Sequence, residues 1–145
     1  MNIDRQRQTE RVVITFGTFD VFHIGHLNIL QRAKALGDRL VVGVSSDALN
    51  LRKKQRAPIY SQTERLAIVG NMKPVDEVFL EESLEAKAAY LQQYQAHVLV
   101  MGDDWLGRFD HLRACCEVVY LPRTPSISTT SIIEVVRSVS GGQGD

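Results

Sequence analysis

Two histidines three residues apart, His23 and His26, are the residues whose types and spacing point most directly to chemistry. They follow an apolar run that ends at Phe16 and precede an amphipathic segment, so they lie where a strand gives way to a helix. A helix start attracts anions, and imidazole N–H groups add donors for the charge of a phosphoryl group. Gly25 leaves room for a phosphate near the backbone. The motif predicts a phosphate site; the alternatives are a structural pair or a metal site, for which no third ligand is evident.

A second candidate phosphate site is the segment from Arg123 to Thr130, which follows the last apolar run and opens a final helix. Arginine presents a planar fork of donors to phosphate, and hydroxyl and amide groups can hold further oxygens. The alternative is a simple helix cap by Ser128 or Thr129. The segment alone is balanced between the two interpretations, and the histidine pair favours the phosphate site.

A basic cluster lies in the segment from Asn50 to Ser61, which is expected to form a mobile loop. Such a run is usually a solvated face, but an enzyme that joins two phosphorylated substrates needs cations to offset their repulsion. The cluster consists of Arg52, Lys53, Lys54 and Arg56.

Other charged residues have weaker patterns. Asp103 and Asp104 follow a strand end, where carboxylates bind ribose hydroxyls, a base or a metal, or simply form an Asp-rich turn. Arg65, Lys73 and Lys87 lie on or next to predicted helices, and their pattern favours a surface position.

The elements that position these residues follow from short apolar runs that alternate with segments of helical spacing. This order predicts right-handed crossovers and one doubly wound, Rossmann-like α/β domain with about five mostly parallel strands in the order 3-2-1-4-5. Ligands of such sheets bind beyond the carboxyl ends of the strands. The predicted strands are 12–16, 40–44, 78–80, 98–101 and 118–121, and the predicted helices lie within 27–36, 61–72, 84–91 and 129–136.

Length and composition limit the remaining possibilities. The chain has 145 residues and is expected to form one domain over residues 12–138, with a polar extension at 1–11 and a flexible tail at 139–145. The formal net charge of zero argues against a broad nucleic-acid-binding face. No apolar run is long enough to span a membrane. Two adjacent cysteines and a polar N-terminus without a signal-peptide core favour the cytoplasm.

The chain resembles the HxGH-type nucleotidyltransferases, and among them the cytidylyltransferases that act on glycerol 3-phosphate. The resemblance covers roughly residues 12 to 137. Five segments carry it: Gly17-Thr18-Phe19-Asp20, His23-Ile24-Gly25-His26, Val100-Met101-Gly102-Asp103-Asp104-Trp105, Val118-Val119-Tyr120-Leu121-Pro122-Arg123-Thr124 and Ile127-Ser128-Thr129-Thr130.

The resemblance implies transfer of CMP from CTP to a phosphorylated alcohol, most closely glycerol 3-phosphate, with CDP-glycerol and pyrophosphate as products. It also implies Mg²⁺ held mainly by the triphosphate, with no protein metal site, and a homodimer. The implied catalytic residues are His23, His26 and Arg123. The implied CTP contacts are Thr18, Phe19, Gly25, Asp103, Arg123, Thr124, Ser128, Thr129 and Thr130. The implied acceptor contacts are Asp20, Lys53 and Lys87.

Four departures from the family pattern bear on the acceptor. Ile24 stands where a tryptophan is expected, Lys73 where an arginine is expected and Ser126 where a glycine is expected, and the basic segment is one residue longer. Two other functions stay open: an adenylyltransferase that uses ATP with FMN or a sugar phosphate, and a non-catalytic nucleotide-binding regulator.

Overall fold

The computed structural model describes residues 10–125 and 127–143. Nearly all of the predicted N-terminal extension, Ser126 and residues 144–145 lie outside these ranges. The described elements are β1 (Val12–Gly17), α2 (Ile24–Lys34), β2 (Arg39–Ser45), α3 (Asp47–Lys54), α4 (Gln62–Gly70), β3 (Glu77–Glu81), α5 (Lys87–Gln93), β4 (Val98–Gly102), the short 3₁₀ helices η1 (Asp103–Trp105) and η2 (Asp110–Ala114), β5 (Glu117–Leu121) and α6 (Thr129–Gln143).

The five strands form one parallel sheet in the order β3-β2-β1-β4-β5, which confirms the predicted fold class and strand order. Ile14 in the central strand β1 lies opposite Val41 of β2 and Leu99 of β4. Because β1 and β4 are neighbours, the turns that follow them meet at the same edge of the sheet.

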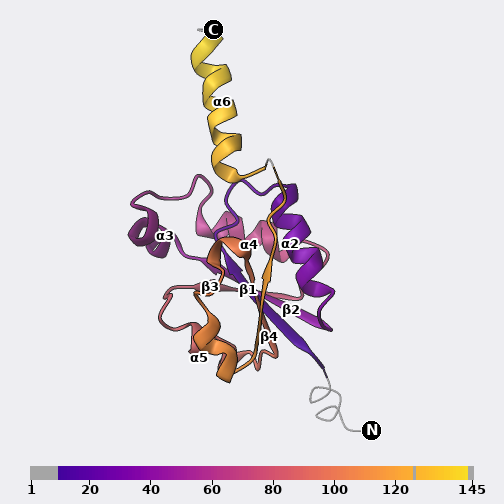
Figure 1. The fold of residues 1–145 in the computed structure, drawn as a ribbon. Coiled ribbons are helices and arrows are strands. Elements are labelled where there is room, and N and C mark those ends of the chain that lie inside the picture. The colour runs from indigo at the N-terminus through magenta and orange to yellow at the C-terminus, as the bar shows by residue number, and fades with distance from the viewer. Residues whose placement is uncertain (1–9, 126, 144–145) are drawn as a thin grey trace.

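Helices cover both faces of the sheet (Figure 1). Successive side chains of a strand point to opposite faces, so Val13 belongs to one core and Ile14 to the other. Helices α2 and α4 contribute Leu30 and Val69 to the core that contains Val13, and α5 contributes Leu91 to the other. Burial on both faces explains why these strands read as continuous apolar runs.

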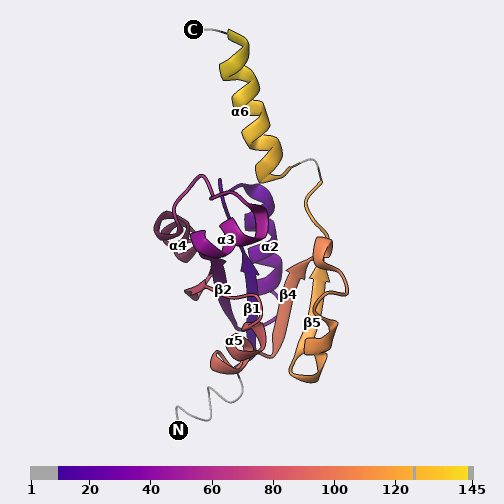
Figure 2. The same cartoon turned by 90° about the vertical axis from the view of Figure 1, so that its left-hand side faces the viewer.

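Helix α6 projects away from the body of the domain, beyond the end of the sheet at which α2 begins (Figures 1 and 2). Its side chains Val135, Val136 and Val139 are exposed. The helix continues through Gln143, past the boundary predicted at residue 138, so residues 139–143 are helical where a flexible tail was expected. Within the described ranges, no helix is long and apolar enough to cross a membrane.

The predicted loop from Asn50 to Ser61 is wrong in its first part, because residues 47–54 form helix α3. Ser46 caps this helix, since its Oγ accepts the amide of Leu49 at 3.0 Å. The helix ends at Gln55, whose φ of 59° is left-handed. The first three basic residues therefore lie on a helix.

Candidate active site

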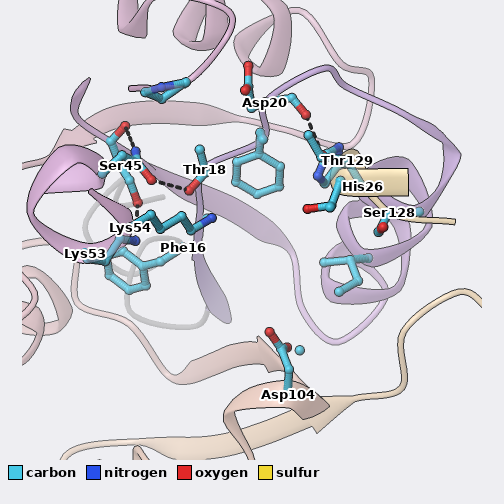
Figure 3. Close-up of a pocket in the computed structure, with 18 of the residues that line it drawn as sticks. Phe16, Thr18, Asp20, His26, Ser45, Lys53, Lys54, Asp104, Ser128 and Thr129 are labelled. Atoms are coloured by element: carbon cyan, nitrogen blue, oxygen red, sulfur yellow. Dashed lines mark hydrogen bonds between the residues drawn. The ribbon is translucent and has the colours of Figure 1, made fainter. Parts of the chain in front are cut away.

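A pocket of about 510 Å³ opens at the carboxyl ends of the strands. Figure 3 shows side chains that line it. Among the residues that line the pocket we distinguish two groups, the histidine end and the lysine end. The histidine end comprises His23, His26, Arg123 and residues 128–130, and the lysine end comprises Phe16, Ser45, Lys53, Glu81 and Lys87.

The turn from β1 into α2 is strained and carries the histidine pair. Phe19 and Val21 have left-handed backbones, with φ of 55° and 46°, although neither is glycine. This conformation is most unfavourable for a β-branched residue and persists only where the surroundings enforce it. The Phe19 ring is buried and meets the ring of His26 edge-on at 5.4 Å between centroids. This contact restricts the position of the His26 ring.

The two histidine rings are held by backbone amides through the same atom. His23 Nδ1 accepts the amide of Gly25 at 3.0 Å, and His26 Nδ1 accepts the amide of His23 at 3.2 Å. The rings stack with 3.8 Å between their centroids. Because Nδ1 is an acceptor in both, each neutral ring carries its proton on Nε2. The pair can therefore present two Nε2–H donors to a ligand in the pocket.

The environment keeps both rings neutral. Burial, followed by the neighbouring His23, lowers the pKa of His26 to about 3. Burial and then the nearby Arg123 guanidinium lower the pKa of His23. A protonated ring would also turn Nδ1 into a donor facing an amide N–H, which would break the cap. Neutral donors match a role in stabilising phosphate charge rather than in accepting a proton at Nδ1.

Gly25 has a packing role that the sequence interpretation did not include. A Cβ at this position would lie 2.8 Å from Cε1 of His23. The missing side chain therefore makes room first for the His23 ring. A role in letting phosphate approach the backbone stays a prediction.

The start of α6 combines a cap with a link to the histidine turn. Ser128 Oγ accepts the amide of Ser131 at 3.1 Å, as expected of a helix cap. Thr129 Oγ1 donates to the backbone carbonyl of Asp20 at 2.7 Å, so it ties α6 to the turn after β1. Thr130 and Arg123 are exposed and line the pocket. Two of the predicted phosphate-binding hydroxyls thus already have structural partners.

Three other predicted contacts also have partners in the structure. Asp20 accepts the backbone amides of Ile59 and Tyr60 at 2.7 and 2.9 Å, and so positions the loop after α3. Thr18 Oγ1 donates to Asn50 at 2.8 Å. Asn28 donates to Thr124 Oγ1 at 3.0 Å. Their contacts with substrates remain predictions.

The lysine end contains a connected buried network. Lys53 Nζ donates to Ser45 Oγ at 3.4 Å, and Ser45 Oγ donates to Glu81 Oε1 at 3.2 Å. The other carboxylate oxygen, Oε2, accepts from Lys87 Nζ at 2.7 Å. Ser45, Glu81 and Lys87 are each at most 3% exposed. Two lysines are therefore joined through one carboxylate, which the sequence analysis did not select.

Lys87 is buried, which corrects the surface position that its sequence pattern favoured. Its Nζ lies 3.6 Å from the centre of the Phe16 ring and 5.2 Å from that of Phe109. Burial lowers the pKa of Lys87, whereas the charge and hydrogen bond of Glu81 oppose the shift. Burial lowers the pKa of Lys53, again opposed by Glu81. Glu81 thus favours the charged form of both lysines.

Arg65 is also fully buried, against the surface position expected for it. Its guanidinium donates to the carbonyls of Tyr60, Thr18 and Ser45 at 3.0, 2.9 and 2.6 Å. It also pairs with Asp47 at 2.7 Å. One side chain thus joins the loop after α3, the turn after β1 and the end of β2, which are three walls of the pocket.

The remaining predicted residues differ in their relation to the pocket. Asp104 lines it, whereas Asp103 and Lys73 do not. Lys54 and Arg56 line it as well. Among the residues that the structure describes, no three His, Cys, Asp or Glu side chains gather as a metal site.

The parallel sheet with a pocket at its carboxyl edge is a Rossmann-like fold, and the comparisons with known proteins show that the protein is a nucleotidyltransferase. The chain belongs to the cytidylyltransferase-like family, whose model matches residues 14–135.

Two named relatives are similar over most of their length. A glycerol-3-phosphate cytidylyltransferase of Bacillus subtilis is 50% identical over 124 residues, which are 86% of this chain and 95% of the relative. One from Staphylococcus aureus is 41% identical and covers 83% of this chain and 90% of the relative. A solved structure of a lipopolysaccharide core biosynthesis protein from Thermoplasma volcanium aligns with a TM-score of 0.68 at 24% identity, over 79% of this chain and 98% of that one. The solved structure supports the fold alone.

Proposed function

We propose that this protein transfers CMP from CTP to glycerol 3-phosphate and forms CDP-glycerol and pyrophosphate. The observation that supports this most strongly is the division of one pocket into a histidine end with neutral donors and a lysine end with two linked cations. The named relatives, which carry this activity in their names, support the same acceptor.

The proposed reaction is a single in-line displacement. A phosphate oxygen of glycerol 3-phosphate attacks the α-phosphorus of CTP, a new P–O bond forms, and the bond to the β-phosphate oxygen breaks with pyrophosphate as leaving group. A phosphate monoester has a second pKa near ~6, so it is already a nucleophilic dianion at neutral pH. A protein nucleophile is therefore unnecessary.

In this proposal the chain contributes position and charge stabilisation. The Nε2–H groups of His23 and His26 donate to oxygens of the phosphate chain, where negative charge develops in the transition state. Arg123 and Thr130 bind further triphosphate oxygens. Lys53 and Lys87 bind the acceptor phosphate and reduce its repulsion from CTP.

The pocket fits a Mg²⁺ ion that CTP brings with it better than an ion bound by the protein alone. Asp20 and Glu81 already accept hydrogen bonds through both carboxylate oxygens, so Asp104 is the pocket-lining carboxylate that would contribute to holding such an ion. When bound, Mg²⁺ neutralises part of the triphosphate charge.

We also propose a homodimer in the cytoplasm. The exposed valines of α6 would be covered in a dimer, and Cys115 and Cys116 are free thiols, as a reducing compartment favours. Light scattering at several protein concentrations tests the dimer, and a constant monomer mass contradicts it.

The activity is tested by pyrophosphate release with Mg²⁺, with CTP or ATP crossed against glycerol 3-phosphate, phosphoethanolamine, FMN and a sugar phosphate. The expected result is turnover with CTP and glycerol 3-phosphate, and chromatography should identify CDP-glycerol. Turnover with ATP alone would favour the adenylyltransferase alternative. CTP turnover with a different acceptor would contradict glycerol 3-phosphate as the substrate.

A further inference from the structure

We propose that Glu81 is a positioning residue of the acceptor site, which holds Lys87 in place directly and Lys53 through Ser45. This inference rests on the proposed function, because it takes the phosphate of glycerol 3-phosphate as the ligand of the two lysines. Neither the sequence pattern nor the resemblance assigned a role to Glu81.

The geometry of Glu81 supports this role. The residue ends β3 at the carboxyl edge of the sheet, lines the pocket and is 1% exposed. Each carboxylate oxygen accepts one hydrogen bond, from Ser45 and from Lys87. A carboxylate with both oxygens occupied presents less repulsion to an incoming phosphate than an unpaired one.

The charges of the network explain why a carboxylate stands near a phosphate site. An ammonium group buried without a partner is strongly disfavoured and loses its proton or moves. Lys87 is 3% exposed, its Nζ lies over the aromatic rings of Phe16 and Phe109, and Lys53 is close enough to interact with it electrostatically. Glu81 therefore favours the charged form of Lys87 against the effect of burial.

Lys53 differs from Lys87 in how firmly it is held. Its bond to Ser45 is 3.4 Å long, at the weak end for a hydrogen bond, and its side chain is only partly buried. The charged groups that act on it are Glu81, Lys54, Lys87 and Arg65. Lys53 is therefore held in place by Ser45 more loosely than Lys87 is held by Glu81.

The test measures KM and kcat for each substrate in the wild type and in Glu81→Gln. Glutamine keeps the shape and removes the charge. Because one charge-assisted contact is lost, the KM of Glu81→Gln for glycerol 3-phosphate should be about tenfold above that of the wild type. Its KM for CTP should change by less than about twofold. Glu82→Gln is the matched control, because Glu82 is the next residue, is exposed and does not line the pocket. It should match the wild type.

Two further readouts separate positioning from simple structural support. Lys87→Gln and the double variant Glu81→Gln/Lys87→Gln complete a double-mutant cycle. The double variant should raise the acceptor KM by less than the product of the two single fold-changes, because the two residues act as one pair. The KM of Glu81→Gln should also rise more steeply than that of the wild type between pH 7 and pH 9, because an unpartnered Lys87 loses its proton more easily. A variant that loses thermal stability but keeps the wild-type acceptor KM at both pH values would overturn the proposal.

A second variant keeps the test decisive even if Glu81→Gln does not fold. If Glu81→Gln does not fold, Ser45→Ala carries the test, because it cuts the link to Lys53 and leaves the Glu81–Lys87 pair intact. It should raise the acceptor KM about threefold, and an unchanged KM would overturn the proposal. A wild-type protein that makes no CDP-glycerol would instead contradict the proposed function and, with it, the acceptor role of the lysines.

Discussion

The two ends of the pocket hold their polar groups in different ways. At the histidine end, backbone amides fix His23 and His26 as neutral rings, and burial keeps the pKa of His26 near 3. At the lysine end, a buried carboxylate holds Lys87 as a cation. The difference matches the two tasks of a phosphate-transfer pocket. Neutral fixed donors can follow charge that develops during reaction, whereas fixed cations attract a dianion before it.

This comparison separates the expected kinetic effects. Loss of a donor at the histidine end should lower kcat, because its contact strengthens in the transition state. Loss of a cation at the lysine end should raise the acceptor KM, because its contact is present in both ground and transition states. Arg65 donates to carbonyls in the walls of both ends. Its loss should therefore affect kcat and the acceptor KM together, and this division of kinetic effects does not apply to it.

The largest expected effect is that of His26→Ala. Removal of one transition-state donor should lower kcat by ~100-fold or more. Steady-state rates of CDP-glycerol formation measure it, and His111→Ala is the control because His111 is exposed and outside the pocket. Near-normal turnover of His26→Ala would remove the assigned role of this ring.

Lys53→Ala should have a smaller and different effect. Loss of a charge-assisted contact with the acceptor phosphate should raise the KM for glycerol 3-phosphate about tenfold and change kcat little. Lys34→Ala serves as control, because Lys34 pairs with Asp76 away from the pocket. A drop in kcat at unchanged KM would contradict the division between the two ends.

The pH dependence of stability should reveal the neutral histidines. The folded pKa of His26, about 3, lies below its ordinary 6.5, so between these values the unfolded chain binds a proton that the folded chain does not. Stability should therefore fall as pH drops from 6.5, by at most about 1.4 kcal/mol per pH unit for this residue. Urea unfolding at pH 7 and pH 5 measures the loss, which should be smaller in His26→Ala and unchanged in His111→Ala. Equal losses in all three proteins would contradict a lowered pKa.

The smallest expected effect concerns the link between α6 and the histidine turn. Thr129→Val removes the bond to the Asp20 carbonyl and should cost about 1 kcal/mol of unfolding free energy. Thr63→Val is the matched control, since Thr63 is exposed on α4. Equal stability of the two variants would show that this bond contributes nothing measurable.

Much of the fold could be predicted because its signals are local. Continuous apolar runs such as 40–44 indicate strands covered on both faces, and their alternation with helical segments indicates a parallel sheet, which the structure contains. The histidine pair was predicted as a site for the same reason, since its glycine and its place between strand and helix are visible in the sequence.

The lysine end was harder to predict because its connections join residues far apart in the chain. Arg65 precedes Val69 by four positions and so shares its buried helix face, a signal that was available. Glu81 directly follows the apolar run 78–80, and the selected Asp103 follows the run 98–101 after one glycine, so the two positions are similar. The partner that makes burial of Lys87 tolerable is visible only once β3 and α5 are packed.

The stereochemical course at the α-phosphorus tests the central claim most directly. CTP with one sulfur on a chiral α-phosphate is reacted with glycerol 3-phosphate, and the configuration of the CDP-glycerol analogue is determined. A single in-line displacement, with the histidines as donors only, predicts inversion. Retention would show two successive displacements through a nucleotidyl-enzyme intermediate and would contradict the account.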